Sequence, residues 1–272
     1  MTDTVPVSVV VPCYRCSLTL ERAVKSVAGQ ARRPVELILV DDFSNDETAK
    51  LLEVLAARYE AGWIKIKWLV QNVGAASARN IGWAAATQPF VAFLDADDAW
   101  HAEKLAIQYA YMQAHPDVAL SGHNHRLLTQ DIALNWKVAE ARATKITKWP
   151  ILLSNKFVTP SVMVRRDVRH RFVENQRHME DHMLWLQVVM GGGGVAKLDS
   201  ELAAIYKQPF GARGLSAQIW LMELGELGNY RRLFSAGLIK FHEFVALCVY
   251  SLVKYVRRLV IFAANLRWNK KP

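Results

Sequence analysis

Strand-like apolar segments alternate with helix-like segments over the first hundred residues, and this alternation limits the possible folds more than any other feature. The first segment, "VSVVVP", is rich in β-branched residues and stops at Pro12. Buried apolar strands separated by helices are typical of a parallel sheet with helices on both faces. We therefore expect an α/β fold with a Rossmann-like, mostly parallel central sheet. The expected strands are 7–12, 35–42, 64–71 and 89–98, and the expected helices are 19–30, 45–60 and 74–86.

The rest of the chain is less regular. Residues 129–150 show no clear periodicity, and the four glycines Gly191–Gly194 indicate a loop that stops a helix. From about residue 215 the pattern is helical, which predicts a C-terminal helical extension. The other expected elements are helices at 102–115 and from 179 to the glycines, and strands at 118–128, 161–168 and 203–208.

Composition narrows the class of protein and of partner. With 272 residues, 52% of them apolar, the chain can form one large domain with an appendage. A net charge of +9 indicates an anionic partner: nucleotide phosphates, nucleic acid or an anionic membrane surface. Three cysteines are too few for a disulfide framework, so we expect a reducing compartment. The sequence shows neither a basic secretory leader nor an uncharged apolar stretch of about 18 residues, which argues against a signal peptide and a transmembrane helix.

Carboxylates gather where two of the expected strands end. Asp41 and Asp42 end one strand, and Asp95 and Asp97 follow another, with Asp98 adjacent. Ligands bind such sheets outside the carboxyl ends of the strands. Clustered carboxylates repel one another, and a divalent cation would relieve this repulsion; hard oxygen ligands favour Mg²⁺ or Mn²⁺. The alternatives are a solvated acidic turn and, for the first pair, a turn or helix cap.

Three further segments carry candidate residues. In "QNVGAASARNIG" a helix begins near Gly74, where phosphate can bind, and Arg79 can supply a cation; close helix–sheet packing is the alternative. Glu180 and Asp181 open a helix, either as catalytic acids or as ordinary partners of the helix dipole. Tyr14, just past the first strand, can stack on a base.

Cys13 and Cys16 form a C-x-x-C pair. A zinc site would need a second such pair, which the sequence lacks. The pair is therefore either a redox motif at a helix start or, on the simpler interpretation, two loop or core cysteines.

Six of these segments, in this order, resemble family 2 glycosyltransferases, which have the GT-A fold. The resemblance runs from about Val7 to Ser216. Three positions depart from the family pattern and leave the acids intact: Phe43 in place of glycine, Ala102 in place of proline, and Lys207 in place of arginine. The matching segments are "VSVVVPCY", "LVDDFSNDET", "NVGAASARNIG", "FLDADDAWHAEKL", "MEDHMLWLQ" and "IYKQPFGARGLS".

The resemblance implies a nucleotide site in the first half of the chain. Pro12, Tyr14 and Asp42 would line the base pocket, and Arg79 would support the nucleotide side. Asp95 would lie near the ribose and the metal. The second acid of the D-x-D segment, Asp97, would coordinate the Mn²⁺ or Mg²⁺ that bridges the diphosphate.

The resemblance also implies an acceptor site. Asp181 would be the general base, Glu180 would position it or contact the acceptor, and Trp100 would form an acceptor platform. Lys207 would keep the positive charge of the family's arginine without its bidentate fork. The expected domains are 1–214, a GT-A catalytic domain with a nucleotide-binding half (1–100) and an acceptor-binding half (101–214), and 215–272, a helical region that can associate with a membrane.

The tail, 238–272, reads as a basic amphipathic helix. A basic helix with aromatic residues suits an anionic membrane surface. The alternative is a helical hairpin packed on the catalytic domain or on a homodimer partner. The expected charged face holds Lys240, Glu243, Ser251, Lys254 and Arg258, and the expected apolar face holds Phe241, Phe244, Val245, Cys248, Leu252, Tyr255, Leu259 and Phe262.

The resemblance thus implies an inverting, metal-dependent transferase. It would move a hexose or related sugar from a nucleotide-diphospho-sugar, by family preference a UDP-sugar, to a glycan or lipid-linked oligosaccharide of bacterial surface polysaccharide. We expect it at the inner face of the cell membrane, on the cytoplasmic side. A nucleotidyltransferase of similar α/β architecture and a non-catalytic membrane-docking scaffold are the alternatives. Nucleic-acid binding would explain the charge but not the acids, so no nucleic-acid partner is expected.

Overall fold

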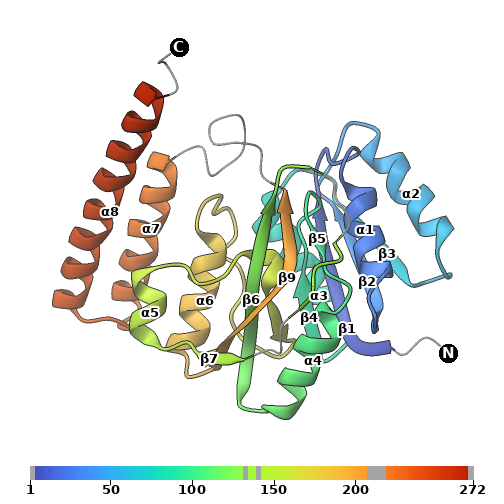
Figure 1. Cartoon of the computed structure of the whole chain (residues 1–272), viewed down its shortest axis with the longest axis horizontal. Helices are drawn as coiled ribbons and strands as arrows, with labels where there is room; N and C mark the ends of the chain where they lie inside the picture. Colours follow the sequence, from blue (N-terminus) through green and yellow to red (C-terminus); the bar gives the residue numbers. More distant parts are fainter. Residues whose placement is uncertain (1–3, 131–133, 139–141, 207–218, 269–272) are drawn as a thin grey trace.

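A nine-stranded sheet with helices on both faces forms the part of the chain that the computed structural model describes (Figure 1). That part comprises residues 4–130, 134–138, 142–206 and 219–268, with side chains to residue 260. The first elements alternate strand and helix as the sequence predicts. They are β1 (Thr4–Cys13), α1 (Leu20–Ala28), β2 (Arg33–Asp41), α2 (Thr48–Arg58), β3 (Ile64–Trp68), α3 (Gly74–Ala85) and β4 (Phe90–Phe93).

The second half adds strands that sequence periodicity indicates less clearly. The described part of the expected strand at 203–208, residues 203–206, is the end of a longer strand, β9, whose first residues include charged side chains and give no apolar run. Residues 129–150 supply β7 and the start of α5. The elements are β5 (Ala99–Trp100), α4 (Lys104–Ala114), β6 (Val118–Leu128), β7 (Ala143–Lys145), α5 (Lys148–Leu153), a 3₁₀ turn (Thr159–Ser161), β8 (Met163–Arg165), α6 (Glu180–Met190), β9 (Gly194–Tyr206), α7 (Ile219–Ser235) and α8 (Phe241–Trp268).

The register of the central strands aligns the acid clusters. Strands pair in the order β3-β2-β1-β4-β8-β6-β9-β5, with β7 beside β9. The first four are parallel, and Cys13 of β1 lies opposite Asp41 of β2 while Val10 lies opposite Phe93 of β4. These strands therefore end at one edge of the sheet. Beyond β4 the sheet is mixed, because β8 runs antiparallel to both of its neighbours.

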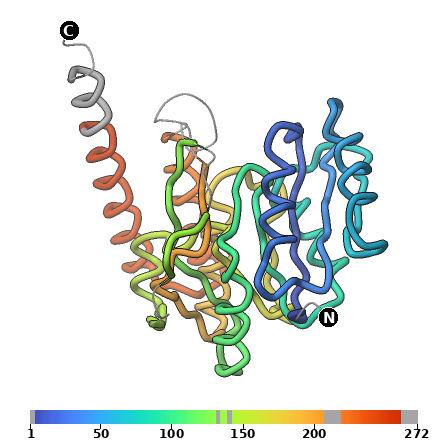
Figure 2. Tube along the Cα trace, turned by 45° about the vertical axis from the view of Figure 1, so that its right-hand side comes forward, coloured from blue at the N-terminus to red at the C-terminus, as the bar shows by residue number. Residues whose placement is uncertain are grey.

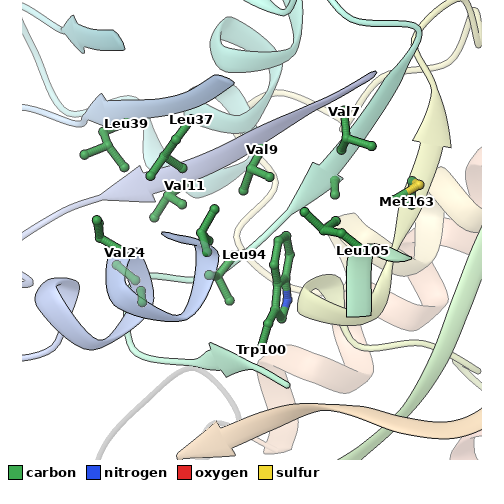
Figure 3. Packing of buried hydrophobic residues seen from close by; sticks show 14 of the residues in the cluster. Val7, Val9, Val11, Val24, Leu37, Leu39, Leu94, Trp100, Leu105 and Met163 are labelled. Atoms are coloured by element: carbon green, nitrogen blue, oxygen red, sulfur yellow. The ribbon is translucent and has the colours of Figure 1, made fainter. Parts of the chain in front are cut away.

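Two hydrophobic cores cover the two faces of the sheet. The alternation of side chains along β1 sends Val7, Val9 and Val11 to one face, where they pack with α1, α2 and α4 (Figure 3). Val10 points to the other face, where α3, α5 and α6 pack. Helices α7 and α8 belong to this second core through Tyr230 and other buried residues. The C-terminal helices are thus packed against the helix that carries Glu180 and Asp181.

The tail packs with part of its charged face inward. Glu243 accepts a hydrogen bond from Lys148 of α5 at 2.7 Å, and Lys254 donates one to Glu226 of α7. Ser251 is buried. Glu243, Ser251 and Lys254 of the expected charged face therefore lie against the protein body, whereas Lys240 and Arg258 are exposed. The hairpin alternative describes this packing, and Figure 2 shows α8 running along the side of the molecule.

Candidate active site

A cleft of about 1160 Å³ opens at the carboxyl ends of β1, β2 and β4. Its walls come from the turn after β1, the start of α3, the segment after β4 and the segment leading into α6. The acid groups at the ends of two strands therefore meet in one place, as the sequence predicts. The expected site residues that line the cleft are Pro12, Tyr14, Asp42, Arg79, Asp95, Asp97 and Glu180.

Arg79 connects the two acid clusters across the cleft. Its side chain is buried, with Nη2 at 2.6 Å from Asp95 Oδ1 and Nη1 at 3.2 Å from Glu180 Oε1. Burial alone would lower the pKa of Arg79, but the two carboxylates outweigh burial and raise it above the ordinary value. The guanidinium is therefore a permanent cation held between donor-side and acceptor-side carboxylates. The expected role of Arg79, to support the nucleotide side of the site, stays a prediction.

The start of α6 presents Glu180 and Asp181 side by side. Met179, just before the helix, adopts a left-handed conformation with φ of +58°. The Asp181 carboxylate accepts hydrogen bonds from the His182 N–H at 2.6 Å and from Asn155 Nδ2 at 3.1 Å. The sequence gives no signal for Asn155, which approaches from the segment after α5. Its contact fixes the orientation of the expected base.

The pKa values of both acids are displaced upward. Burial is the main cause for Asp181, and its hydrogen bonds and the Arg79 charge oppose the change without cancelling it. For Glu180, burial and then the neighbouring Asp181 charge raise the pKa. A carboxylate whose pKa lies closer to neutrality accepts a proton more readily at working pH. This environment suits a general base.

Asp42 is anchored at the start of α3. Its carboxylate accepts hydrogen bonds from the Val73 N–H at 2.7 Å, the Gly74 N–H at 2.9 Å and Asn72 Nδ2 at 3.0 Å. Gly74 has φ of +82°, which favours glycine at the helix start. A carboxylate has about four acceptor positions. Three hydrogen bonds leave about one position for a ligand, so Asp42 both supports α3 and lines the cleft.

The three carboxylates after β4 have separate environments, which explains how they coexist. Asp95 pairs with Arg79, while Asp98 is buried and accepts a hydrogen bond from the Tyr206 N–H at 3.0 Å. Asp97 is exposed at the cleft, and Arg22 donates a hydrogen bond to its backbone carbonyl. Partial withdrawal from solvent, followed by the Asp95 charge, raises the pKa of Asp97. Asp97 is thus the D-x-D carboxylate best placed to meet a cation.

Sequence comparison agrees with this geometry. Residues 8–169 match the profile of the family described as Glycosyl transferase family 2. The chain belongs to this family. One relative is the Escherichia coli protein WfgD, a UDP-Glc:alpha-D-GlcNAc-diphosphoundecaprenol beta-1,3-glucosyltransferase. The two chains are 31% identical over 184 residues, a match that covers 67% of this chain and 69% of WfgD.

Solved structures share the fold of this family 2 glycosyltransferase. Staphylococcus aureus TarS 1–349 in complex with UDP-GlcNAc superposes with a TM-score of 0.65 at 20% identity, over 92% of this chain and 80% of that chain. The Pyrobaculum calidifontis mannosyltransferase PcManGT, in complex with GDP-Man and Mn²⁺, has a TM-score of 0.68 at 16% identity, over 99% and 82% of the two chains. The fold is therefore GT-A, a mixed α/β architecture.

The metal that the family implies fits this transferase only in part. Within the described residues, no three His, Cys, Asp or Glu side chains lie close enough to form a metal site by themselves. Asp97 is accessible, and the nearby Asp95 charge is one that a cation would relieve. Mg²⁺ and Mn²⁺ are commonly held by one or two carboxylates together with substrate phosphates. Asp97 would hold the ion, with Asp95 beside it.

Trp100 does not form an acceptor platform. The ring is 2% exposed, and its Nε1 donates a hydrogen bond to the Pro160 carbonyl at 2.8 Å. Lys104 Nζ lies 3.6 Å from the centroid of the same ring. The aromatic side chain is part of the first core (Figure 3) because β5 turns inward to pair with β9. Lys207, the other expected supporting residue, lies outside the described residues.

The C-x-x-C cysteines are unpaired and buried. The Cys16 side chain and burial raise the pKa of Cys13 well above its usual range. A thiol of high pKa is a poor nucleophile and a poor metal ligand. The simpler interpretation, core cysteines at the end of β1, describes them.

Two arginines at the cleft were not singled out by the sequence. Arg15 and Arg177 line the cleft, from the turn after β1 and from the segment before α6. Arg15 lies 5.3 Å from the centroid of the Tyr14 ring. In the sequence, only the proximity of these arginines to Tyr14 and to Glu180 could have marked them as cleft residues, since arginine is common on protein surfaces. They supply positive charge that Arg79, already paired, cannot.

Proposed function

We propose that the protein transfers a hexose or related sugar, with inversion, from a UDP-sugar to a hydroxyl of a glycan or lipid-linked oligosaccharide in bacterial surface polysaccharide synthesis. One observation carries the proposal: a cleft at the strand ends holds the D-x-D carboxylates, and Arg79 links them to the acid pair of α6. The relative WfgD, named for a UDP-Glc donor and a diphosphoundecaprenol acceptor, supports the donor and acceptor classes.

The donor base would bind between β1 and α3. Tyr14 is half exposed at the cleft and offers a ring face, and Pro12 forms the adjacent wall. Asp42 retains about one acceptor position for an N–H of the base, since three hydrogen bonds occupy the others. The complexes of TarS with UDP-GlcNAc and of PcManGT with GDP-Man support a nucleotide-sugar donor.

The diphosphate would lie over Asp97, with a divalent cation between them. Mn²⁺ in the PcManGT complex supports this cofactor class. The cation would stabilise the negative charge that develops on the leaving nucleoside diphosphate. Arg177 and Arg15 would add positive charge from the cleft walls, because Arg79 is neutralised by Asp95 and Glu180.

Asp181 would remove the proton from the acceptor hydroxyl. As the hydroxyl oxygen bonds to the anomeric carbon, its proton passes to the Asp181 carboxylate, and the bond from that carbon to the diphosphate oxygen breaks with its electron pair. Attack from the face opposite the leaving group inverts the anomeric centre. Glu180 lines the donor cleft and is paired with Arg79, so it would position the site.

The test compares Asp181→Asn with the matched variant Glu180→Gln. Loss of a general base lowers turnover by about 10²–10⁴-fold. We expect Asp181→Asn to show this loss while UDP affinity, measured by titration calorimetry, stays near wild type. Glu180→Gln should lose less, because a neutral amide still accepts a hydrogen bond from Arg79. A larger loss in Glu180→Gln than in Asp181→Asn would reassign the base.

Metal and nucleotide choice are tested by calorimetry with UDP, GDP and dTDP, each with and without Mn²⁺. We expect UDP binding that depends on Mn²⁺ and is lost in Asp97→Asn. Asp46→Asn is the matched control, since Asp46 also lines the cleft but belongs to the segment between β2 and α2 and not to the D-x-D segment. Binding of none of the three nucleotides to folded protein would refute the proposal.

A further inference from the structure

The outward face of α8 has an unusual composition for a helix on a protein surface. Six aliphatic residues at helical spacing are each 42–63% exposed and form one continuous band, which we call the outer stripe. Among the described side chains of α8 the only acid is Glu243, which is bound to Lys148. The outer stripe comprises Val245, Val249, Leu252, Val253, Val256 and Val260.

Three polar side chains of α8, those of Glu243, Ser251 and Lys254, face the protein instead. Lys254 binds Glu226 and donates a hydrogen bond to the Leu153 carbonyl at 3.1 Å, and Ser251 is fully buried. A surface helix normally turns its apolar face to the core and its charges to water. In α8, some charged and polar residues face the protein and some apolar residues face solvent. A contiguous exposed apolar surface of this kind marks a site of interaction with another molecule or a membrane.

Aromatic and basic residues border the outer stripe. Trp220 of α7 is half exposed, and its ring lies 5.6 Å from that of Tyr255 on α8. Arg257 follows Val256 of the outer stripe, is exposed, and forms no ion pair with any residue whose side chain the structure describes. Tryptophan, tyrosine and basic residues are the side chains that favour the boundary between lipid and water.

We propose that the outer stripe docks on an anionic lipid bilayer, with α8 lying in the plane of the interface. Among the described helices there is no candidate for a membrane span. A helix with exposed apolar residues beside basic and aromatic ones suits the interface plane. The charge of the chain favours lipid over a second copy of the chain as the partner of the outer stripe. Two copies meeting at this stripe would bring together chains of formal charge +9, whereas anionic headgroups complement Arg257, which is exposed next to the stripe.

Docking along α8 would also orient the active site. The parallel strands and α8 run toward the same end of the molecule, with α8 on one side and β1, β2 and β3 on the other (Figure 1). The cleft opens at the carboxyl ends of those strands. Docking along α8 would thus set the direction in which the cleft faces relative to the bilayer. The use of this orientation to meet a lipid-linked acceptor rests on the proposed function; the docking itself does not.

The experiment is co-sedimentation of the full chain with vesicles of phosphatidylcholine alone or with an equal share of phosphatidylglycerol. The test variant is Val249→Asn with Val256→Asn, and the matched control is Val54→Asn with Val70→Asn, two valines exposed elsewhere. Burial of one valine side chain changes partitioning by about tenfold. We expect the test variant to lose at least tenfold in binding to anionic vesicles and the control to bind as wild type.

Two further variants separate the contributions. Arg257→Gln should weaken binding to anionic vesicles by about fivefold and leave binding to neutral vesicles unchanged. Quenching of tryptophan fluorescence by brominated lipid should decrease in Trp220→Phe, because this ring lies beside the stripe.

The outcomes distinguish this inference from the proposed function. UDP affinity without vesicles should be equal in all variants, since none of the substituted residues lines the cleft. Docking would be refuted if the wild type bound neither vesicle type, or if the stripe variant bound vesicles as well as the control does. This holds even if the protein binds UDP. Dimers in wild type that become monomers in the stripe variant would assign the stripe to a second copy. Vesicle binding without nucleotide binding would refute only the proposed function.

Discussion

Arg79→Met is the substitution whose consequences the structure defines most sharply. It removes the cation between Asp95 and Glu180 while keeping most of the side-chain volume. Both pairs involve a guanidinium that is only 5% exposed. Removing one partner of a buried ion pair costs about 3–5 kcal/mol, because the remaining charge stays buried without compensation. We expect a loss of that size in the free energy of unfolding at pH 8, measured by urea denaturation.

The loss should depend on pH in a defined direction. In the wild type the folded-state pKa values of Glu180 and Asp181 are already raised, mainly by burial. Without the arginine they rise further, because the positive charge that opposes the rise is lost. The folded variant then takes up protons before the unfolded chain does as the pH falls. Its deficit should therefore shrink between pH 8 and pH 5.5.

The pH dependence of catalysis should also show the raised pKa of the base. A base with a higher pKa becomes protonated at higher pH, so the acid limb of the kcat/KM profile should move upward in Arg79→Met. The control is Arg126→Met, which breaks an exposed Arg–Glu pair of 2.5 Å with Glu201. Such exposed pairs contribute about 0–1 kcal/mol. Equal destabilisation in the two variants, or a deficit for Arg79→Met that is the same at both pH values, would refute the reasoning.

Two substitutions in the cores test the packing. Lys104 is fully buried, its Nζ has no hydrogen-bond partner among the described residues, and burial lowers its pKa well below the ordinary value. Unfolding therefore takes up a proton near neutral pH. In urea titrations, Lys104→Met should raise the free energy of unfolding more at pH 6 than at pH 9. The opposite trend would show that the Trp100 ring holds a charged lysine. Gly82→Ala would place its Cβ 2.3 Å from a methyl carbon of Val10, so a loss of about 1–3 kcal/mol is expected by the same assay, and unchanged stability would mean that β1 and α3 can separate without cost.

The sequence determined the fold class and the edge of the sheet where the site lies. Continuous apolar strands can be buried on both faces only in a sheet covered by helices, and parallel strands end at one edge. The positions of Asp42, Asp95 and Asp97 follow from this rule, and all three line the cleft. Glu180 and Asp181 were assigned by a family motif rather than by periodicity, and the structure brings Glu180 into the same cleft.

Tertiary structure decided what each side chain is free to do. Arg79 could have faced a ligand or a carboxylate; the approach of α6 to the cleft, 101 residues later in the chain, pairs it with Glu180. Trp100 follows the D-x-D segment as an acceptor platform would, but the pairing of β5 with β9 buries it. Both outcomes depend on contacts between distant segments, which local sequence patterns do not encode.

The tail shows the same division. Its sequence specifies a helix with basic and apolar residues, and periodicity divides them into two faces. Which face meets water depends on the partners that α5 and α7 offer. Lys148 and Glu226 supply countercharges for Glu243 and Lys254, so part of the polar side turns inward and the outer stripe is left exposed. Periodicity records that a helix has two faces, whereas only the packed neighbours select the one that is buried.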